Sequence, residues 1–305
     1  MIILNGPTNL CLGTVQFGLD YGIRRFGQPS AAVAIEILEF AIQNGINTID
    51  TAAAYGTAEE VVGAFLESHV GIRGQIELIS KFQPNGIDNV PHERYGVVMR
   101  ETLLCSLDKL KVNYLDSYLL HNPKHMFDGC IIEALLQLKQ AGFVKSIGAS
   151  VYTPDEAKKG IECGLDILQI PYSVFDQRMA EQGIFDLALR NNVKLHARSA
   201  FTQGLMLMEE LDVPPHLEKA RPVVREYAKF CEDNNVSRLN LAIAFVGRQR
   251  SISHLVFGVD RKEQLLEIVR AHKQSVPEGV LDEATLKFAG LNEELIMPSR
   301  WKQSE

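Results

Sequence analysis

The segment Gly45-Ile46-Asn47-Thr48-Ile49-Asp50-Thr51-Ala52-Ala53-Ala54-Tyr55-Gly56 carries the most specific pattern in this sequence. Gly45 follows a stripe of apolar residues with helical spacing, and glycine commonly occupies the position after a helix ends. The apolar run from Thr48 to Asp50 predicts a buried strand, and Asp50 stands at its end. A helix, a strand and a polar loop are therefore expected in succession.

The same alternation of strand and helix continues along the chain. Gly142 also follows an apolar stripe, and Thr153-Pro154 combines a capping hydroxyl with proline at the first helical position. Eight strand and helix units that close on themselves predict a (β/α)8 barrel, an α/β fold whose strands are apolar because both faces are covered. An open doubly wound sheet is the alternative. The predicted strands are residues 10–13, 48–50, 77–80, 115–120, 146–149, 167–170, 194–197 and 254–257.

Composition limits the classes of protein that fit. The chain has 305 residues, 46% of them hydrophobic, and no linker-like segment, so we expect residues 1–305 to form a single domain with a large core. The net charge of −7 argues against a nucleic-acid surface, which needs clustered Lys and Arg. The absence of a long apolar run and of a leader-like N-terminus predicts no membrane partner and a cytoplasmic location.

The five cysteines are scattered and form no CxxC pair. Neither a disulfide framework nor a structural metal site is expected, and free thiols in a reducing cytosol are the simplest interpretation. The longest irregular segments are residues 15–30, 122–129, 200–222 and the tail from Met297. In a barrel, the first three would lie at the C-terminal ends of the strands, where ligands bind.

Four polar side chains stand at the ends of predicted strands or in the loops after them. They are the carboxylate of Asp50, the phenol of Tyr55, the ammonium of Lys81 and the imidazole of His121. At one end of a parallel barrel these groups would meet. Together they predict a tuned proton donor, which is the chemistry that carbonyl reduction needs.

With these residues in place, the sequence resembles the aldo-keto reductase superfamily of nicotinamide-dependent (β/α)8 oxidoreductases. The resemblance runs from Leu12-Gly13-Thr14 to about Gly258, and its specificity comes from the order and spacing of several motifs. Besides the segment quoted first, these motifs are Ile79-Ser80-Lys81, Asp116-Ser117-Tyr118-Leu119-Leu120-His121, Ser146-Ile147-Gly148-Ala149-Ser150 and Leu168-Gln169.

The chemistry explains why these residue types would meet. A carbonyl oxygen develops negative charge as its carbon receives hydride, so a nearby acid must supply a proton. Tyr55 is the expected acid, and the ammonium of Lys81 is expected to lower its pKa. Asp50 would keep Lys81 charged, and His121 would orient the substrate. The resemblance implies the same four roles, although each residue alone also fits an ordinary turn, cap or packing role.

The resemblance also implies a nicotinamide cofactor, with NADPH expected and NADH as the alternative. It implies that Ser150 and Gln169 bind the carboxamide, and that Ser199 and the backbone near Phe201 to Gly204 approach the pyrophosphate. The implied cofactor contacts are Gly13, Thr14, Asp50, Ser150, Gln169, Ser199, Phe201, Gly204, Gly258, Arg261 and Lys262.

Four positions depart from the family pattern. Val151 stands where an Asn commonly holds the carboxamide, and Arg198 stands where an aromatic ring usually stacks on the nicotinamide. The charge of Arg198 would oppose the oxidised ring or serve an anionic substrate. Gln264 and Ile268 take the places of an Arg for the 2′-phosphate and an Asn for the adenine.

Arg261 or Lys262, near these last two positions, would replace the positive charge of the missing Arg. The alternative is that both are solvated residues in the first turn of a helix. Asp260 would cap the following helix or repel a 2′-phosphate. For the substrate, six residues are expected around the mouth of the barrel, although plain loop packing explains each of them equally well. They are Phe17, Tyr21, Phe82, His125, Met126 and Trp301.

The sequence therefore predicts reversible reduction of a small-molecule aldehyde or ketone by a monomer or small homo-oligomer that uses no metal. Two alternatives stay open. One is a cofactor-sensing subunit with little turnover, similar to the barrel subunits attached to potassium channels. The other is a lyase or isomerase that uses Lys81 as a Schiff base.

Overall fold

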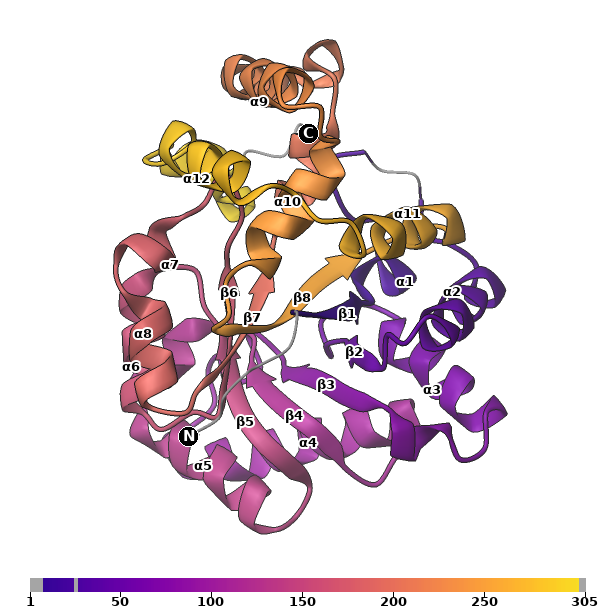
Figure 1. The fold of residues 1–305 in the computed structure, drawn as a ribbon. Helices are drawn as coiled ribbons and strands as arrows, with labels where there is room; N and C mark the ends of the chain where they lie inside the picture. Colours follow the sequence, from indigo (N-terminus) through magenta and orange to yellow (C-terminus); the bar gives the residue numbers. More distant parts are fainter. Residues whose placement is uncertain (1–7, 25–26, 302–305) are drawn as a thin grey trace.

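The computed structural model describes residues 8–24 and 27–301, and its centre is a closed barrel of parallel strands (Figure 1). Each strand pairs with the next along the chain, and β8 pairs with β1 to complete the ring. The predicted (β/α)8 fold is confirmed. The strands are β1 (Asn9–Gly13), β2 (Thr48–Asp50), β3 (Glu77–Phe82), β4 (Leu115–Leu120), β5 (Val144–Ser150), β6 (Ile167–Pro171), β7 (Lys194–Arg198) and β8 (Ile252–Gly258).

The strand β3 is longer than the sequence predicted. Its apolar run ends at Ser80, yet the ladder continues through Lys81 and Phe82, which pair with β4. Lys81 therefore lies inside the strand and not after it. A buried ammonium is tolerated there because the carboxylate of Asp50 at the end of β2 neutralises it.

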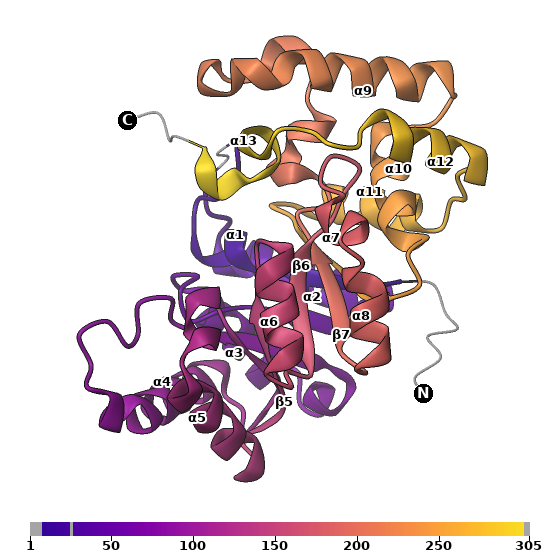
Figure 2. The same cartoon turned by 90° about the vertical axis from the view of Figure 1, so that its left-hand side faces the viewer.

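Helices surround the barrel (Figures 1 and 2). One main helix lies between each strand and the next or follows β8; these helices are α2 (Ala31–Gln43), α3 (Ala58–Ser68), α4 (Tyr95–Leu110), α5 (Gly129–Gln140), α6 (Pro154–Glu162), α8 (Ile184–Arg190), α10 (Arg238–Gly247) and α11 (Lys262–His272). Additional helices are α1 (Val15–Gly18), α7 (Arg178–Glu181), α9 (Arg221–Asp233), α12 (Glu278–Lys287) and α13 (Glu293–Ile296). Among the described residues, no helix is both long and apolar enough to cross a membrane.

The predicted helix ends are present. Gly45 and Gly142 both have positive φ, 80° and 78°, which glycine adopts without steric cost. The hydroxyl of Thr153 accepts from the Glu156 backbone N–H, and the Glu156 carboxylate accepts in return, which forms a capping box at the start of α6.

The core lies mainly between the strands and the helices, where a single large cluster of buried apolar side chains joins both layers. A second, small cluster consists of Ile79, Leu119 and Ile167, which come from β3, β4 and β6. Since these residues are separate from the strand–helix core, we place them in the barrel interior. The barrel is thus filled below its C-terminal end, as expected for this fold.

The loops after β1 and β2 touch each other through two glycines. A Cβ atom on Gly18 would lie 1.7 Å from the carbonyl oxygen of Tyr55, and one on Gly56 would lie 2.2 Å from the carbonyl oxygen of Gly18. No other residue type fits at this approach. The contact holds Tyr55 against the end of α1, so Phe17 and Gly18 are packed helix residues and not part of the irregular segment expected over residues 15–30.

The segment that follows β7 is less irregular than expected. It contains three short 3-10 helices, η4 (Thr202–Leu207), η5 (Glu210–Asp212) and η6 (Pro215–Ala220), before α9 begins. In the C-terminal segment, α13 contacts both η6 and η7 (Pro298–Arg300). The last part of the predicted tail falls outside the described residues. That residues 1–305 form one domain stays a prediction.

Candidate active site

The four polar groups singled out in the sequence come together at the C-terminal end of the barrel. Lys81 lies at the centre, with its Nζ atom 2.6 Å from Asp50 Oδ2, 2.9 Å from the carbonyl oxygen of Thr51 and 3.3 Å from Tyr55 Oη. Asp50 ends β2, and Tyr55 lies in the loop that follows. The fourth residue, His121, comes directly after β4 and meets the Tyr55 ring edge-on, with ring centroids 5.5 Å apart.

A cavity of about 610 Å³ opens above these residues. Asp50, Tyr55 and His121 line it, whereas Lys81 lies beneath them and is only 1% exposed. Pockets of roughly 300–1,000 Å³ bind most small ligands and cofactors. The cavity is therefore large enough for a small molecule to contact three of the four groups directly.

The expected lowering of the Tyr55 pKa is not what the structure gives. Burial raises the pKa of Tyr55 above its ordinary value, and the positive charge and hydrogen bond of Lys81 offset this only in part. The sequence showed the cation but not the depth of the phenol, and desolvation is the larger effect. Tyr55 therefore stays protonated at neutral pH, as a proton donor must be.

Lys81 keeps its charge in spite of its depth. Burial alone would lower the pKa of Lys81, but the negative charge of Asp50 and the hydrogen bonds to Asp50 and Tyr55 raise it above the ordinary value. Asp50 is itself held on the other side, because Gln169 Nε2 donates to its Oδ1 atom. The carboxylate is thus fixed between an ammonium and an amide.

His121 is a neutral imidazole at physiological pH. Burial, together with the nearby charges of Lys81 and Arg198, lowers the pKa of His121 to about 3. Its Nδ1 atom is buried and has no hydrogen-bond partner among the described residues. A neutral ring can present an N–H group to an oxygen atom of a ligand in the cavity.

Most residues that the resemblance implied for the cofactor lie around this cavity. Thr14 and Lys262 do not. The Thr14 side chain is fully buried and donates to the carbonyl oxygen of Asp50, so it supports the end of β2 from below. The Lys262 ammonium lies over the ring of Phe40, 5.4 Å from its centroid. The residues that do line the cavity are Gly13, Asp50, Ser150, Gln169, Ser199, Phe201, Gly204, Gly258 and Arg261.

At the start of α11, Gln264 has a structural contact that the sequence did not suggest. Its Oε1 atom accepts from the Asp260 backbone N–H at 2.8 Å. The N-cap residue of α11 is Arg261, so Asp260 does not cap this helix as one interpretation expected. Asp260 and Glu267 both line the cavity here and bring two carboxylates to this end.

Of the residues expected around the mouth for the substrate, only Tyr21 lines the cavity. Trp301 does not, and its indole N–H donates to the Glu294 carbonyl oxygen. The remaining residues are packed into the interior, three of them within the main apolar core. They are Phe17, Phe82, Met126 and His125, which are 0%, 0%, 1% and 6% exposed.

Sequence reasoning missed several residues that line the cavity, among them Gln16, Tyr152 and Leu239. Gln16 lies against Gly258, where an added Cβ atom would be 2.2 Å from its Oε1. Tyr152 follows Ser150 and Val151 directly, so its place after β5 was a usable signal. Gln16 and Leu239 belong to no motif, and nothing in the sequence marked them.

Three cavity residues carry a buried polar atom with no partner in the described part of the chain. These atoms are Gln16 Oε1, His121 Nδ1 and Arg198 Nε. Buried polar groups are normally satisfied, so unpaired ones around a cavity indicate a polar ligand. A nucleotide cofactor with its amide, hydroxyl and phosphate groups fits this lining.

Comparison with known proteins agrees with this geometry. A family model described as "Aldo/keto reductase family" matches residues 9–283. The chain belongs to the aldo/keto reductase family. Most of this aldo/keto reductase, including every strand of the barrel, lies within the matched range.

Two characterised or named relatives align over much of the chain. This aldo/keto reductase is 27% identical to "Uncharacterized oxidoreductase YqkF" of Bacillus subtilis (strain 168) over 260 residues, 78% of this chain and 81% of that protein. It is 25% identical to "NADH-specific methylglyoxal reductase" of Escherichia coli (strain K12) over 299 residues, 87% of this chain and 91% of that protein. Both relatives are named as oxidoreductases.

The fold is also similar to solved structures. The aldo-keto reductase AKR11C1 from Bacillus halodurans, in its holo form, superposes with a TM-score of 0.74. The two sequences are 21% identical, and the match covers 94% of each chain. This likeness supports the barrel assignment for the aldo/keto reductase described here.

A second group of ligating atoms lies away from the cavity of this aldo/keto reductase. Donor atoms of His92, Asp128 and Cys130 are all within 4.8 Å of one another, which the scattered cysteines did not suggest. His92 and Cys130 are exposed, and Asp128 Oδ1 already accepts from the Cys130 N–H at the start of α5. We assign no metal to this group.

Proposed function

We propose that the protein catalyses the reversible reduction of an aldehyde or ketone to an alcohol with a nicotinamide cofactor. The observation that carries this proposal is the position of Lys81 Nζ, between the buried carboxylate of Asp50 and the hydroxyl of Tyr55, directly below the cavity. Membership of the aldo/keto reductase family supports the same reaction class.

In this reaction, a bound reduced nicotinamide supplies hydride to the carbonyl carbon. Tyr55 donates its phenolic proton to the carbonyl oxygen, which would otherwise carry the developing negative charge. The phenolate that remains lies 3.3 Å from the Lys81 ammonium, and this contact stabilises it. Before transfer, burial keeps the pKa of Tyr55 raised and the phenol neutral. The main effect of Lys81 is therefore to stabilise the phenolate that forms when the proton has left.

His121 and Asp50 complete the proposed machinery. A neutral His121 donates an N–H to the carbonyl oxygen and orients it toward the Tyr55 hydroxyl. Asp50 keeps the Lys81 ammonium charged, and Gln169 and the Thr14 contact hold Asp50 in place. In the oxidative direction the Tyr55 phenolate accepts the proton from the alcohol.

For the cofactor, we propose that NADPH binds and that NADH is accepted as well. By resemblance, the end of the cavity near Gly258 receives the adenosine. One cation, Arg261, lines this end, together with the carboxylates of Asp260 and Glu267. Two carboxylates weaken the attraction for a 2′-phosphate. One relative is named as NADH-specific, which supports testing both cofactors.

The Schiff-base alternative is opposed by the contacts of Lys81. Its ammonium donates to Asp50, Thr51 and Tyr55, which uses all three N–H groups, and its pKa is raised. A Schiff-base lysine needs the opposite, a free amine with a lowered pKa. A cofactor-sensing subunit stays an alternative that slow turnover with every carbonyl would favour. The cytoplasmic location and the monomeric or small oligomeric state stay predictions.

The test is a Tyr55→Phe variant assayed for NADPH- and NADH-dependent carbonyl reduction. Loss of the acid should lower kcat by about 10²- to 10⁴-fold, while fluorescence titration shows that both cofactors still bind. Tyr114→Phe, a change at the distant Arg73 and Lys145 contact, is the matched control and should retain full turnover. Full turnover in Tyr55→Phe would refute the assignment of the acid.

A further inference from the structure

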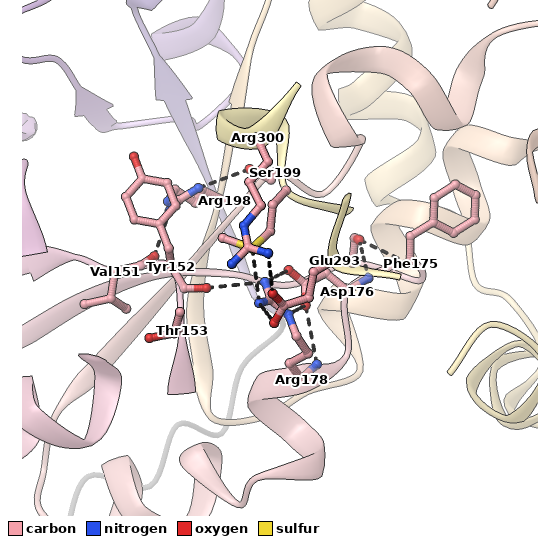
Figure 3. A network of polar contacts seen from close by, with 12 residues as sticks. Val151, Tyr152, Thr153, Phe175, Asp176, Arg178, Arg198, Ser199, Glu293 and Arg300 are labelled. Carbon is pink, nitrogen blue, oxygen red and sulfur yellow. Dashed lines mark hydrogen bonds and ion pairs between the residues drawn. The ribbon is translucent and has the colours of Figure 1, made fainter. Parts of the chain in front are cut away.

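Arg198, the last residue of β7, lies in the wall of the cavity and is half-buried. Its Nη2 atom donates to the Val151 carbonyl oxygen at 2.7 Å, and Nη1 donates to Ser199 Oγ at 3.3 Å (Figure 3). The guanidinium also lies 4.4 Å from the centroid of the Tyr152 ring. These contacts fix the plane of the guanidinium before any ligand binds.

The main chain of Tyr152 is held by a charged network around Arg178. Arg178 Nη2 donates to the carbonyl oxygen of Tyr152, and the same guanidinium pairs with Asp176 at 2.7 Å and with Glu293 of α13 at 3.1 Å (Figure 3). The loop after β5 is thereby tied to the C-terminal segment. These contacts hold the backbone of Tyr152, whose ring lies against the Arg198 guanidinium.

The charge of Arg198 is not neutralised by the protein. Across residues 8–24 and 27–301, no ion pair includes Arg198, and its Nε atom is buried without a hydrogen-bond partner. Other cations at the cavity differ, since Arg24 pairs with Asp212 and Lys81 pairs with Asp50. A partly buried cation without a counter-ion carries a desolvation cost that an anionic ligand would offset.

The charge of Arg198 affects the pKa of groups that line the cavity where the reaction is proposed to occur. Its charge helps to lower the pKa of His121, after burial and Lys81, and it opposes the larger effect of burial on the pKa of Tyr21. It is therefore within electrostatic reach of groups on two sides of the cavity. A guanidinium has five N–H donors, of which the contacts with Val151 and Ser199 use two.

We propose that Arg198 binds a carboxylate carried by the carbonyl substrate, so that the preferred substrates are keto acids or aldehyde acids. This inference rests on the proposed function and deepens it. The remaining N–H groups form a planar fork that matches the two oxygens of a carboxylate. Arg198, His121 and Tyr55 line the same cavity, so a substrate whose carboxylate contacts Arg198 can present its carbonyl group to Tyr55.

The test compares two aldehydes of nearly equal shape, 4-carboxybenzaldehyde and 4-nitrobenzaldehyde, of which only the first is anionic. In Arg198→Gln, the ratio of kcat/KM for the carboxylate to kcat/KM for the nitro compound should fall by about 10- to 100-fold, mainly through KM. Arg198→Lys keeps the charge but loses the fork, so its ratio should fall less. Thermal unfolding and cofactor titration check that both variants are folded.

An unchanged ratio in Arg198→Gln would overturn the inference. So would a weaker affinity for the cofactor with an equal loss for both aldehydes, because Arg198 would then contact the phosphates of the nucleotide. Benzoate binding to the cofactor-loaded protein, measured by calorimetry, needs no turnover. If the wild-type protein reduces neither aldehyde but binds benzoate through Arg198, the proposed function fails and the anion site stands. If it neither reduces an aldehyde nor binds benzoate, the anion site is refuted as well.

Discussion

Replacing Asp50 with Asn should cost the protein about 3–5 kcal/mol of unfolding free energy, because it leaves a buried ammonium without its counter-ion. Lys81 is 1% exposed, and its contact with Asp50 Oδ2, at 2.6 Å, is its shortest. After the substitution, the remaining acceptors are the Thr51 carbonyl oxygen and the Tyr55 hydroxyl, and neither carries a negative charge.

The measurement is urea unfolding at pH 7 followed by circular dichroism, for the wild type, Asp50→Asn, Lys81→Met and the double variant. Because the double variant buries no unpaired charge, it should be more stable than Asp50→Asn, with a coupling energy of about 2 kcal/mol or more. Asp233→Asn is the control, since Lys229 and Asp233 form an exposed pair on α9. We expect a loss of at most about 0.5 kcal/mol there.

The same variant has a characteristic pH dependence. Without Asp50, burial should lower the pKa of Lys81 below its value in the unfolded chain. The unfolded state then binds more protons, so the stability of Asp50→Asn should rise with pH through the range in which folded Lys81 has lost its proton and the unfolded chain has not. A loss below about 1 kcal/mol, or no greater than that of Asp233→Asn, would refute the account of the buried pair.

Three further changes test other parts of the structure. Burial and the charge of Lys194 lower the pKa of His254 to about 4, so between about pH 6.5 and 4 the unfolded chain binds a proton at this residue and the folded protein does not. This difference should remove about 3 kcal/mol of stability as the pH falls from 6.5 to 4. In His254→Gln, the unfolding free energy measured across that range should therefore depend less on pH. Gly56→Ala should destabilise the folded protein by roughly 1–3 kcal/mol and lower kcat, because φ at this position is +54° and the new Cβ would meet the neighbouring backbone. Gly74→Ala is the control, since the space around Gly74 is open, and it should change neither thermal unfolding nor turnover. Arg178→Met removes the ion pair with Glu293 that ties α13 to Arg178, so limited proteolysis should cut the C-terminal segment faster while the barrel stays intact. An unchanged cleavage rate would contradict the bracing role.

Much of the fold was predictable from local patterns. The strand runs, the glycines at 45 and 142 and the Thr153 cap each act over a few residues, and all appear where the sequence indicated them. The extension of β3 through Lys81 was not predictable in the same way. A lysine ends an apolar run in the sequence, and only the carboxylate of a neighbouring strand makes its burial tolerable.

The candidate site shows the same division. The order of Asp50, Tyr55, Lys81 and His121 was visible because each follows or ends a strand, and parallel strands deliver their ends to one place. The direction of the Tyr55 pKa shift was wrong because depth cannot be seen in a linear pattern. The buried aromatic residues of the loops were likewise expected at the mouth, since a sequence does not show which ring packs inward.

By itself, the sequence determined the barrel and the identity of the four polar groups at its C-terminal end, because periodicity, caps and strand order are local properties of the chain. Tertiary structure alone decided how deeply Tyr55 and Lys81 are buried, that Gln264 is occupied by the Asp260 backbone, and that Arg198 lacks a carboxylate partner among the described residues. Desolvation and the pairing of charges depend on which residues meet in space, and that depends on the packing of segments far apart in the chain.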